Sequence, residues 1–159
     1  MAELASIAPR FVAMAHRIVW CTVGTVDAHG SPRTRVMHPI WEWDGTDLTG
    51  WIITTPGSPK GRDLDRRPEL SLTYWAPNQD TCTADCATEW DDTPELRQAG
   101  WDRFANGPEP VGYDPSVVAR WSSPDADAFG VLRLRPSRLR VLDGERLSDG
   151  PSAVQIWKR

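Results

Sequence analysis

A serine and a lysine near the middle of the chain stand in a pattern that suits the capture of an anion. The segment 54–60 leads from an apolar stretch into a short helical pattern. Ser58 has the side chain of a helix N-cap, and Pro59 suits the first helical position because its fixed φ is helical and its missing N–H is not needed there. Lys60 is unusual, since a cation in a first turn opposes the positive end of the helix macrodipole. A bound anion would explain this lysine, and phosphate is the leading candidate.

Two arginines upstream have residue types and spacing that suit the same anion. With a period of two, Arg33, Arg35 and Met37 fall on one face of a predicted strand. Guanidinium groups grip phosphate oxygens through paired hydrogen bonds. Taken alone, the two arginines fit a solvated strand edge better, because charged side chains are usually exposed. Joined to Ser58 and Lys60, they favour an anion clamp.

Thr54 and Thr55 end a predicted strand just before this segment. Their hydroxyl or backbone groups would face whatever binds at the helix start, while β-propensity alone is the plainer explanation. Five aromatic side chains could stack on a planar ring or simply pack in the core: Trp41, Trp43, Trp51, Tyr74 and Trp75.

Other reactive patterns are missing from the sequence. It contains no GxGxxG or Walker pattern and no evident Ser-His-Asp or Cys-His arrangement. His16, His29 and His38 lack metal-ligand spacing, and acids such as Asp63 are expected to be solvated. We therefore assign no metal site and no catalytic residue. If the protein is an enzyme, its chemistry belongs to a bound cofactor.

Length and charge limit the remaining classes. The 159 residues fit one domain, 1–159, with a core at about 18–142 and a polar C-terminal tail at 143–159. A net charge of −4 argues against nucleic acid and anionic membranes as partners. No apolar run approaches the roughly 20 residues of a membrane helix, so we expect a cytoplasmic protein. Three cysteines do not suggest a disulfide framework, and we expect them to be structural.

The hydrophobic pattern predicts an α+β fold: an antiparallel barrel of six or seven strands with three flanking helices. The conformation of 105–124, which is rich in proline and glycine, cannot be read from the sequence. Strands are predicted at 18–26, 32–43, 48–55, 70–75, 80–90, 129–134 and 137–142, and helices at 2–17, from 59 to no further than 67, and from a capping Asp92 to about 104.

These motifs together resemble a known family. The quoted stretches are 25–37, the Trp-Asp-Gly turn at 43–45, Ile-Thr-Thr at 53–55, Ser-Pro-Lys at 58–60 and 66–74. In this order they resemble the pyridoxamine 5′-phosphate oxidase-like, FMN-binding split β-barrel superfamily, and they look closest to its general stress protein-like branch of flavin and deazaflavin oxidoreductases. The similarity covers about residues 4–142, with its specific part between Thr25 and Tyr74.

The resemblance implies a homodimeric split β-barrel that holds FMN, or in some branches F420, at the subunit interface. A small-molecule substrate or a nicotinamide donor would exchange hydride with it. Two departures stand out: the arginine-rich C-terminal substrate segment of the true oxidases is missing, and Pro59 replaces a basic residue of many relatives. Carried over position by position, the cofactor-binding residues are Arg35, Val36, Met37, Thr54, Thr55, Ser58 and Lys60, with Arg33 as a weaker match.

Three functions therefore stay open at this point. The first is an FMN-dependent oxidoreductase, and the second is an F420-dependent reductase of the same fold. The third is a non-catalytic stress protein that binds flavin or haem, because a fold does not by itself imply catalysis.

Overall fold

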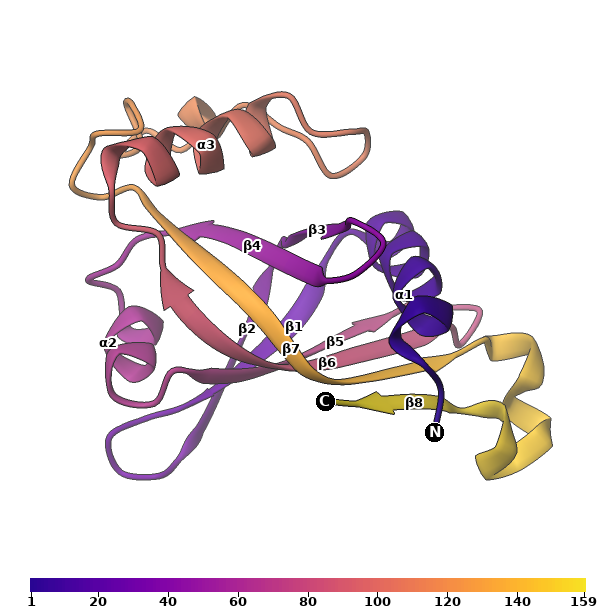
Figure 1. The fold of residues 1–159 in the computed structure, drawn as a ribbon. Helices are drawn as coiled ribbons and strands as arrows, with labels where there is room; N and C mark the ends of the chain where they lie inside the picture. The colour runs from indigo at the N-terminus through magenta and orange to yellow at the C-terminus, as the bar shows by residue number, and fades with distance from the viewer.

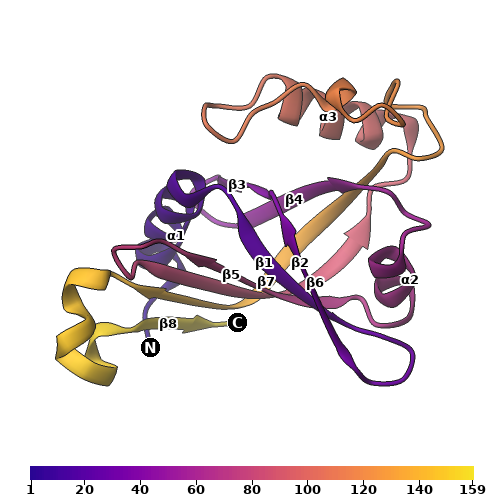
Figure 2. The same cartoon turned by 180° about the vertical axis from the view of Figure 1, so that it is seen from behind.

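One antiparallel sheet, curled around an apolar core, carries the fold (Figures 1 and 2). The computed structural model describes residues 1–159. The strand order is β2-β1-β5-β6-β7-β4-β3, with β8 beside β7. The strands are β1 (Cys21–Val26), β2 (Pro32–Met37), β3 (Ile40–Trp43), β4 (Leu48–Thr54), β5 (Glu69–Trp75), β6 (Thr81–Trp90), β7 (Gly130–Leu142) and β8 (Gln155–Lys158). The helices are α1 (Leu4–Ile18), α2 (Pro59–Arg66) and α3 (Pro94–Ala105), with 3₁₀ segments η1 (Pro115–Val117) and η2 (Gly144–Ala153).

The sheet is open between two strands that are neighbours in the chain. The sequence predicted one strand over 32–43, and this prediction is wrong. The structure breaks it at His38-Pro39, so that β2 pairs with β1 and β3 pairs with β4 at the opposite end of the strand order. Pro39 has no N–H to donate to a ladder, which ends the pairing at this point. The predicted α+β split β-barrel is confirmed.

β7 is a single strand where the sequence predicted two around Pro136. It runs beside β6 along its whole length, with an irregular register between Asp85 and Cys86. Its first half pairs with β4 and its second half with β8. Pro136 lies at this changeover, where its missing N–H costs least because the pairing partner changes there.

The segment expected to be a polar tail, 143–159, forms η2 and then β8, which joins the sheet beside β7. Both chain ends lie near β8 (Figures 1 and 2). The N–H of Ala2 donates to the carbonyl of Ile156 at 2.8 Å, and Trp157 packs against the core. An edge strand of only four residues is too short for its alternation to give a clear signal. It brings the strand total to eight.

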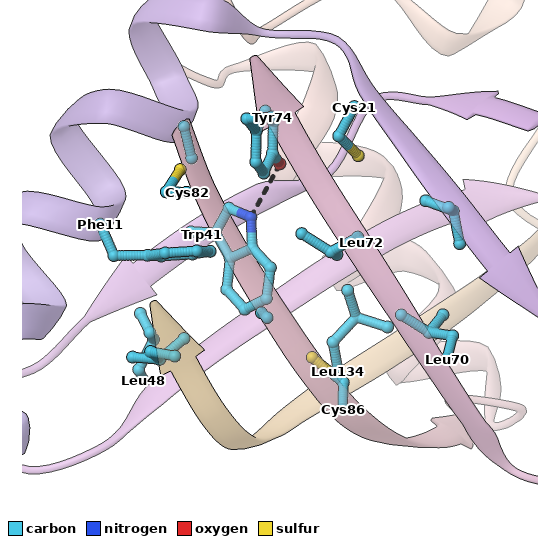
Figure 3. Packing of buried hydrophobic residues seen from close by; sticks show 14 of the residues in the cluster. Phe11, Cys21, Trp41, Leu48, Leu70, Leu72, Tyr74, Cys82, Cys86 and Leu134 are labelled. Carbon is cyan, nitrogen blue, oxygen red and sulfur yellow. Dashed lines mark hydrogen bonds between the residues drawn. The ribbon is translucent and has the colours of Figure 1, made fainter. Parts of the chain in front are cut away.

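Trp41 fills the centre of the barrel (Figure 3). Its indole N–H donates to the hydroxyl of Tyr74 at 2.9 Å, and the ring of Phe11 meets it edge-on at 4.9 Å between centroids. Gly50 lies opposite Trp41 in the β3–β4 register. A Cβ added at Gly50 would lie 2.7 Å from the indole, so the large ring depends on the missing side chain.

The three cysteines surround this core and are free and buried (Figure 3). Burial raises the pKa of Cys21 to about 12 and raises the pKa values of Cys82 and Cys86 well above the ordinary thiol range. Because a thiol reacts as its thiolate, these cysteines are structural, as predicted.

Helices and loops cover two separate faces of the sheet. α1 covers the barrel interior with Ile7, Phe11 and Met14. α3 and the segment 106–128 lie over β4 (Figure 1). Thr93, rather than the predicted Asp92, caps α3, because its hydroxyl accepts the N–H of Leu96. A second apolar cluster lies beneath this cover: Ile40, Trp51, Ile53, Phe104, Val111, Trp121, Phe129 and Val131. None of the helices has the length and apolar character needed to cross a lipid bilayer.

The start of α2 is packed tightly against the loop before it. A Cβ added at Gly61 would lie 1.6 Å from the carbonyl oxygen of Pro56. A Cβ added at Gly57, in the same loop, would meet nothing within 4 Å. The loop and the first turn of α2 therefore share one fixed conformation.

We expect Gly61→Ala to destabilise the protein by roughly 1–3 kcal/mol, the usual cost of overpacking. In an ordinary helix the same change is stabilising, so the sign tests the contact. Urea unfolding measures the effect, and Gly57→Ala is the matched control. Equal stability of the two variants would contradict the packing described here.

Two histidines on neighbouring elements are held neutral. Nε2 of His16 accepts the N–H of Trp41 at 2.9 Å, which requires an unprotonated nitrogen. Burial lowers the pKa of His16, although the charge of Glu42 raises it in part. Burial also lowers the pKa of His38, although a hydrogen bond with the backbone of Val111 raises it in part. His16 thus joins the end of α1 to β3, and His38, in the break between β2 and β3, packs against Trp20, Phe104 and Tyr113.

We expect the free energy of unfolding to fall between pH 7.5 and 5.5. The unfolded histidines bind protons near their ordinary pKa of 6.5, above the lowered pKa values in the folded state, so acid favours unfolding. The limit is about 1.4 kcal/mol per histidine and pH unit, and solvent screening of the partly exposed rings reduces it. In a His16→Gln, His38→Gln double variant the fall should be smaller, whereas His29→Gln in the exposed turn should behave as the parent. An unchanged fall in the double variant would contradict this origin.

Candidate functional site

Arg35, Ser58 and Lys60 come together where α2 meets the β1–β2 hairpin, and we call this group the anion cradle. Ser58 caps α2, with its Oγ accepting the N–H of Gly61 at 3.3 Å. The same oxygen accepts a hydrogen bond from Nζ of Lys60 at 3.3 Å. Burial lowers the pKa of Lys60, and the charge of Arg35 lowers it further, because the two cations repel each other. The structure therefore brings three of the predicted residues into one site.

The cradle still has hydrogen-bond donors to offer. The hydroxyl oxygen of Ser58 accepts two bonds, so its own O–H is free to donate. Lys60 uses one of three ammonium donors, and the guanidinium of Arg35 gives one bond to the carbonyl of Val23 at 3.2 Å. A phosphate presents several acceptor oxygens with negative charge, so this donor set fits a phosphate group.

The charges of the cradle are partly withdrawn from water. Burial lowers the pKa of Arg35, and the carboxylate of Asp63 raises it in part. Two like charges held close together repel each other, and an anion bound between them would relieve that repulsion. The first turn of α2 adds the positive end of a helix dipole.

Asp63 is the residue of this region that the sequence analysis placed wrongly. It was expected to be solvated, but only 7% of it is exposed. Its Oδ2 accepts a hydrogen bond from Oγ1 of Thr25 at 3.0 Å, also buried. Helical spacing could have predicted this burial. Asp63 is three residues after Lys60, which places both on one side of the helix, and it directly precedes Leu64, which lies in the core.

Three predicted residues on β2 lie elsewhere. Arg33 is bound to the carboxylate of Asp27 at 2.9 Å in the hairpin turn, and its side chain is 61% exposed. Val36 points away from the barrel and is exposed, as the strand alternation requires. Met37 packs against the core. Of the four β2 positions proposed for the cofactor, only Arg35 joins the cradle.

The two threonines before the cradle have different surroundings, because Thr54 ends β4 and Thr55 lies in the loop after it. Thr54 is buried, at the end of β4. The hydroxyl of Thr55 accepts the indole N–H of Trp121 at 3.3 Å, so it ties the loop to the cover formed by 106–128. Its side chain is used for packing rather than for the cradle.

The aromatic residues considered for stacking on a cofactor ring also lie outside the cradle. Trp41 and Tyr74 are buried in the barrel core, and Trp43 is partly buried against it. Trp51 lies under the guanidinium of Arg103, 3.7 Å from the ring centroid. Trp75 is more than half exposed on the outer face of β5. The structure places none of them in the cradle.

Comparison with solved structures shows the same fold in proteins of low sequence identity. A Clostridium acetobutylicum protein related to general stress protein 26 aligns with a TM-score of 0.67 at 13% identity, covering 98% of this chain and 94% of the other. An FMN-binding, pyridoxamine 5′-phosphate oxidase-related protein of Nostoc punctiforme aligns with a TM-score of 0.65 at 15% identity, covering 100% and 97%. An F420 reductase aligns with a TM-score of 0.56 at 17% identity, covering 80% and 93%.

The comparison of sequences gives the family. No curated protein matches the chain. The family described as pyridoxamine 5′-phosphate oxidase matches residues 7–143, which include every strand of the barrel except the C-terminal β8 and all residues of the cradle. The chain belongs to the pyridoxamine 5′-phosphate oxidase family.

Proposed function

We propose that the protein binds FMN through the anion cradle and acts as a flavin-dependent oxidoreductase. The observation that carries the proposal is a serine-capped helix start where Lys60 donates to Ser58 and is within electrostatic reach of the like charge of Arg35, on a barrel of this family. Two cations and a free hydroxyl suit the doubly charged phosphate at the end of FMN.

Within this proposal the residues of the chain bind and orient. Lys60 and Arg35 hold the phosphate by charge, and Ser58 donates its hydroxyl hydrogen. When bound, the flavin supplies a ring that exchanges two electrons, as a hydride, with a reduced nicotinamide or another small substrate. No side chain is assigned a proton-transfer role, so the contribution of the protein is placement of the ring.

Lys60→Ala and Arg35→Ala should each weaken FMN binding by roughly 1–3 kcal/mol, the range for a lost charged hydrogen bond. That loss corresponds to about 5- to 150-fold in Kd. Titration followed by flavin fluorescence measures it. Arg33→Ala is the matched control, because Arg33 already pairs with Asp27 and should leave the affinity unchanged. Parental affinity in both cradle variants would remove the cradle from the site.

F420 is the rival cofactor, and one feature of α2 favours it. Arg62 and Arg66 are exposed, and their side chains bind only the backbone carbonyls of Gly57 and Arg62. Exposed guanidinium groups that have no carboxylate partner, beside the cradle, suit the longer anionic tail of F420. Titrating the parent with both cofactors decides between them, and a loss of affinity in Arg62→Ala for F420 alone would identify the tail contact.

A cofactor reservoir without catalysis is the proposal from another class. Steady turnover of an electron donor by the loaded protein supports the oxidoreductase. Tight binding without turnover of reduced nicotinamides or other donors supports the reservoir. Haem storage would also require an axial ligand, and the Nε2 of His16 is already engaged by Trp41.

We further propose that the protein is a homodimer that pairs through the outer face of β2, β1 and β5. Three apolar side chains share this face by strand register and alternation, Val26, Val36 and Trp75, and Trp20 directly precedes β1; each of the four is 38–62% exposed. Beside them lies a hollow of about 510 Å³, lined in part by Gly24, Ser71 and Ala87. Exposed apolar surface of this kind is typical of a protein contact.

Val36→Glu should dissociate the homodimer, because it would bury an unpaired charge at the centre of the contact. Size-exclusion chromatography with light scattering gives the mass in solution. Leu147→Glu, which adds the same charge at an exposed apolar residue of η2, is the control and should leave the mass unchanged. A monomeric parent, or a dimeric Val36→Glu variant, would refute this contact.

A further inference from the structure

Asp63 is a buried carboxylate whose burial calls for an explanation. It lies on α2, is 7% exposed and accepts one hydrogen bond, at 3.0 Å, from the hydroxyl of Thr25 on β1. Withdrawing a carboxylate from water is costly unless charges or hydrogen bonds compensate for it. The nearby compensating charge is that of Arg35 in the anion cradle.

The topology places Asp63 on the helix of Lys60 and beside the hairpin of Arg35. Thr25 and Val23 point to the same face of β1, and Val23 lies opposite Arg35 in the β1–β2 register. Asp63 therefore contacts the strand beside the one that carries Arg35. On α2, Asp63 follows Lys60 by three residues, which places both on one side of the helix. The charge of Asp63 favours the charged form of Arg35 against the effect of burial.

Docking of α2 alone does not require this carboxylate. Leu64 buries its side chain in the core. Asp65 accepts the indole N–H of Trp90 at 3.0 Å, and the guanidinium of Arg67 donates to the carbonyl of Asp27 at 2.6 Å. Three contacts without Asp63 already hold the helix to the barrel.

We propose that Asp63 is a positioning residue of the phosphate site, which fixes the helix of Lys60 against the hairpin of Arg35 through Thr25. Its negative charge favours the charged form of Arg35, and its hydrogen bond holds α2, and with it Lys60, against β1 before an anion arrives. It acts through Arg35 and Lys60 and does not touch the phosphate. The inference rests on the proposed function, because it assigns a task to Asp63 only if the cradle binds a phosphate.

The test compares FMN with riboflavin, which has the same ring and lacks the phosphate. Thr25→Val removes the hydrogen bond with little change of volume, and Asp63→Asn removes the charge while keeping an acceptor. Each should weaken FMN binding by about fivefold to tenfold, the scale of one lost hydrogen bond. Riboflavin affinity should stay constant, which excludes general unfolding as the cause.

Two further variants sharpen the comparison. Thr25→Ser keeps the hydroxyl and should restore the parental ratio of FMN to riboflavin affinity. Thr83→Val changes a partly buried strand threonine that makes no side-chain hydrogen bond, and it should not alter the ratio.

The outcomes separate the two proposals. A parent that binds riboflavin as tightly as FMN has no phosphate site, so the proposed function fails and the role of Asp63 falls with it. A parent that prefers FMN, with the same preference in Thr25→Val and Asp63→Asn, keeps the phosphate site and overturns the role of Asp63. Tighter FMN binding by Asp63→Asn would likewise overturn it, because the carboxylate would then only repel the phosphate.

Discussion

A missing backbone donor at Pro39 divides the sheet, and the arrangement of the barrel depends on this break. Without an N–H at that position, the ladder of β2 cannot continue into β3, and the chain crosses to the opposite end of the strand order. The N–H of Trp41 then finds its partner in a side chain, Nε2 of His16, rather than in a neighbouring strand. α1 packs against β3 at the open side of the barrel, and α2 packs against β1 of the β1–β2 hairpin.

Local chemistry allowed part of the structure to be predicted from the sequence. Ser58 and Pro59 specify a helix start by side-chain type alone, and α2 begins at Pro59. The alternation of the β2 residues correctly placed Arg35 and Val36 on opposite faces. What could not be predicted depends on distant partners. Whether Arg33 lies in the cradle is decided by Asp27, which reaches it through the geometry of a turn.

The same reason explains the missed elements. β8 has only four residues, and it is stabilised by pairing with the far half of β7, whose position no local pattern reveals. Asp63 looked like any solvated acid because its burial follows from the docking of α2 on Thr25. Pro136 suggested two strands, since a proline interrupts one ladder, but an extra residue in β7, Ser137, shifts the register beside Pro136 and accommodates it within a single strand.

The packing of Trp41 against Gly50 limits which substitutions this barrel can accept during evolution. The indole occupies the volume that any side chain at position 50 would need, and its N–H is committed to Tyr74. A larger residue at position 50 is therefore compatible only with a smaller one at position 41, which would also leave the tyrosine hydroxyl without its donor. Among homologous sequences the three positions should covary, and the identity of one should be informative about the other two.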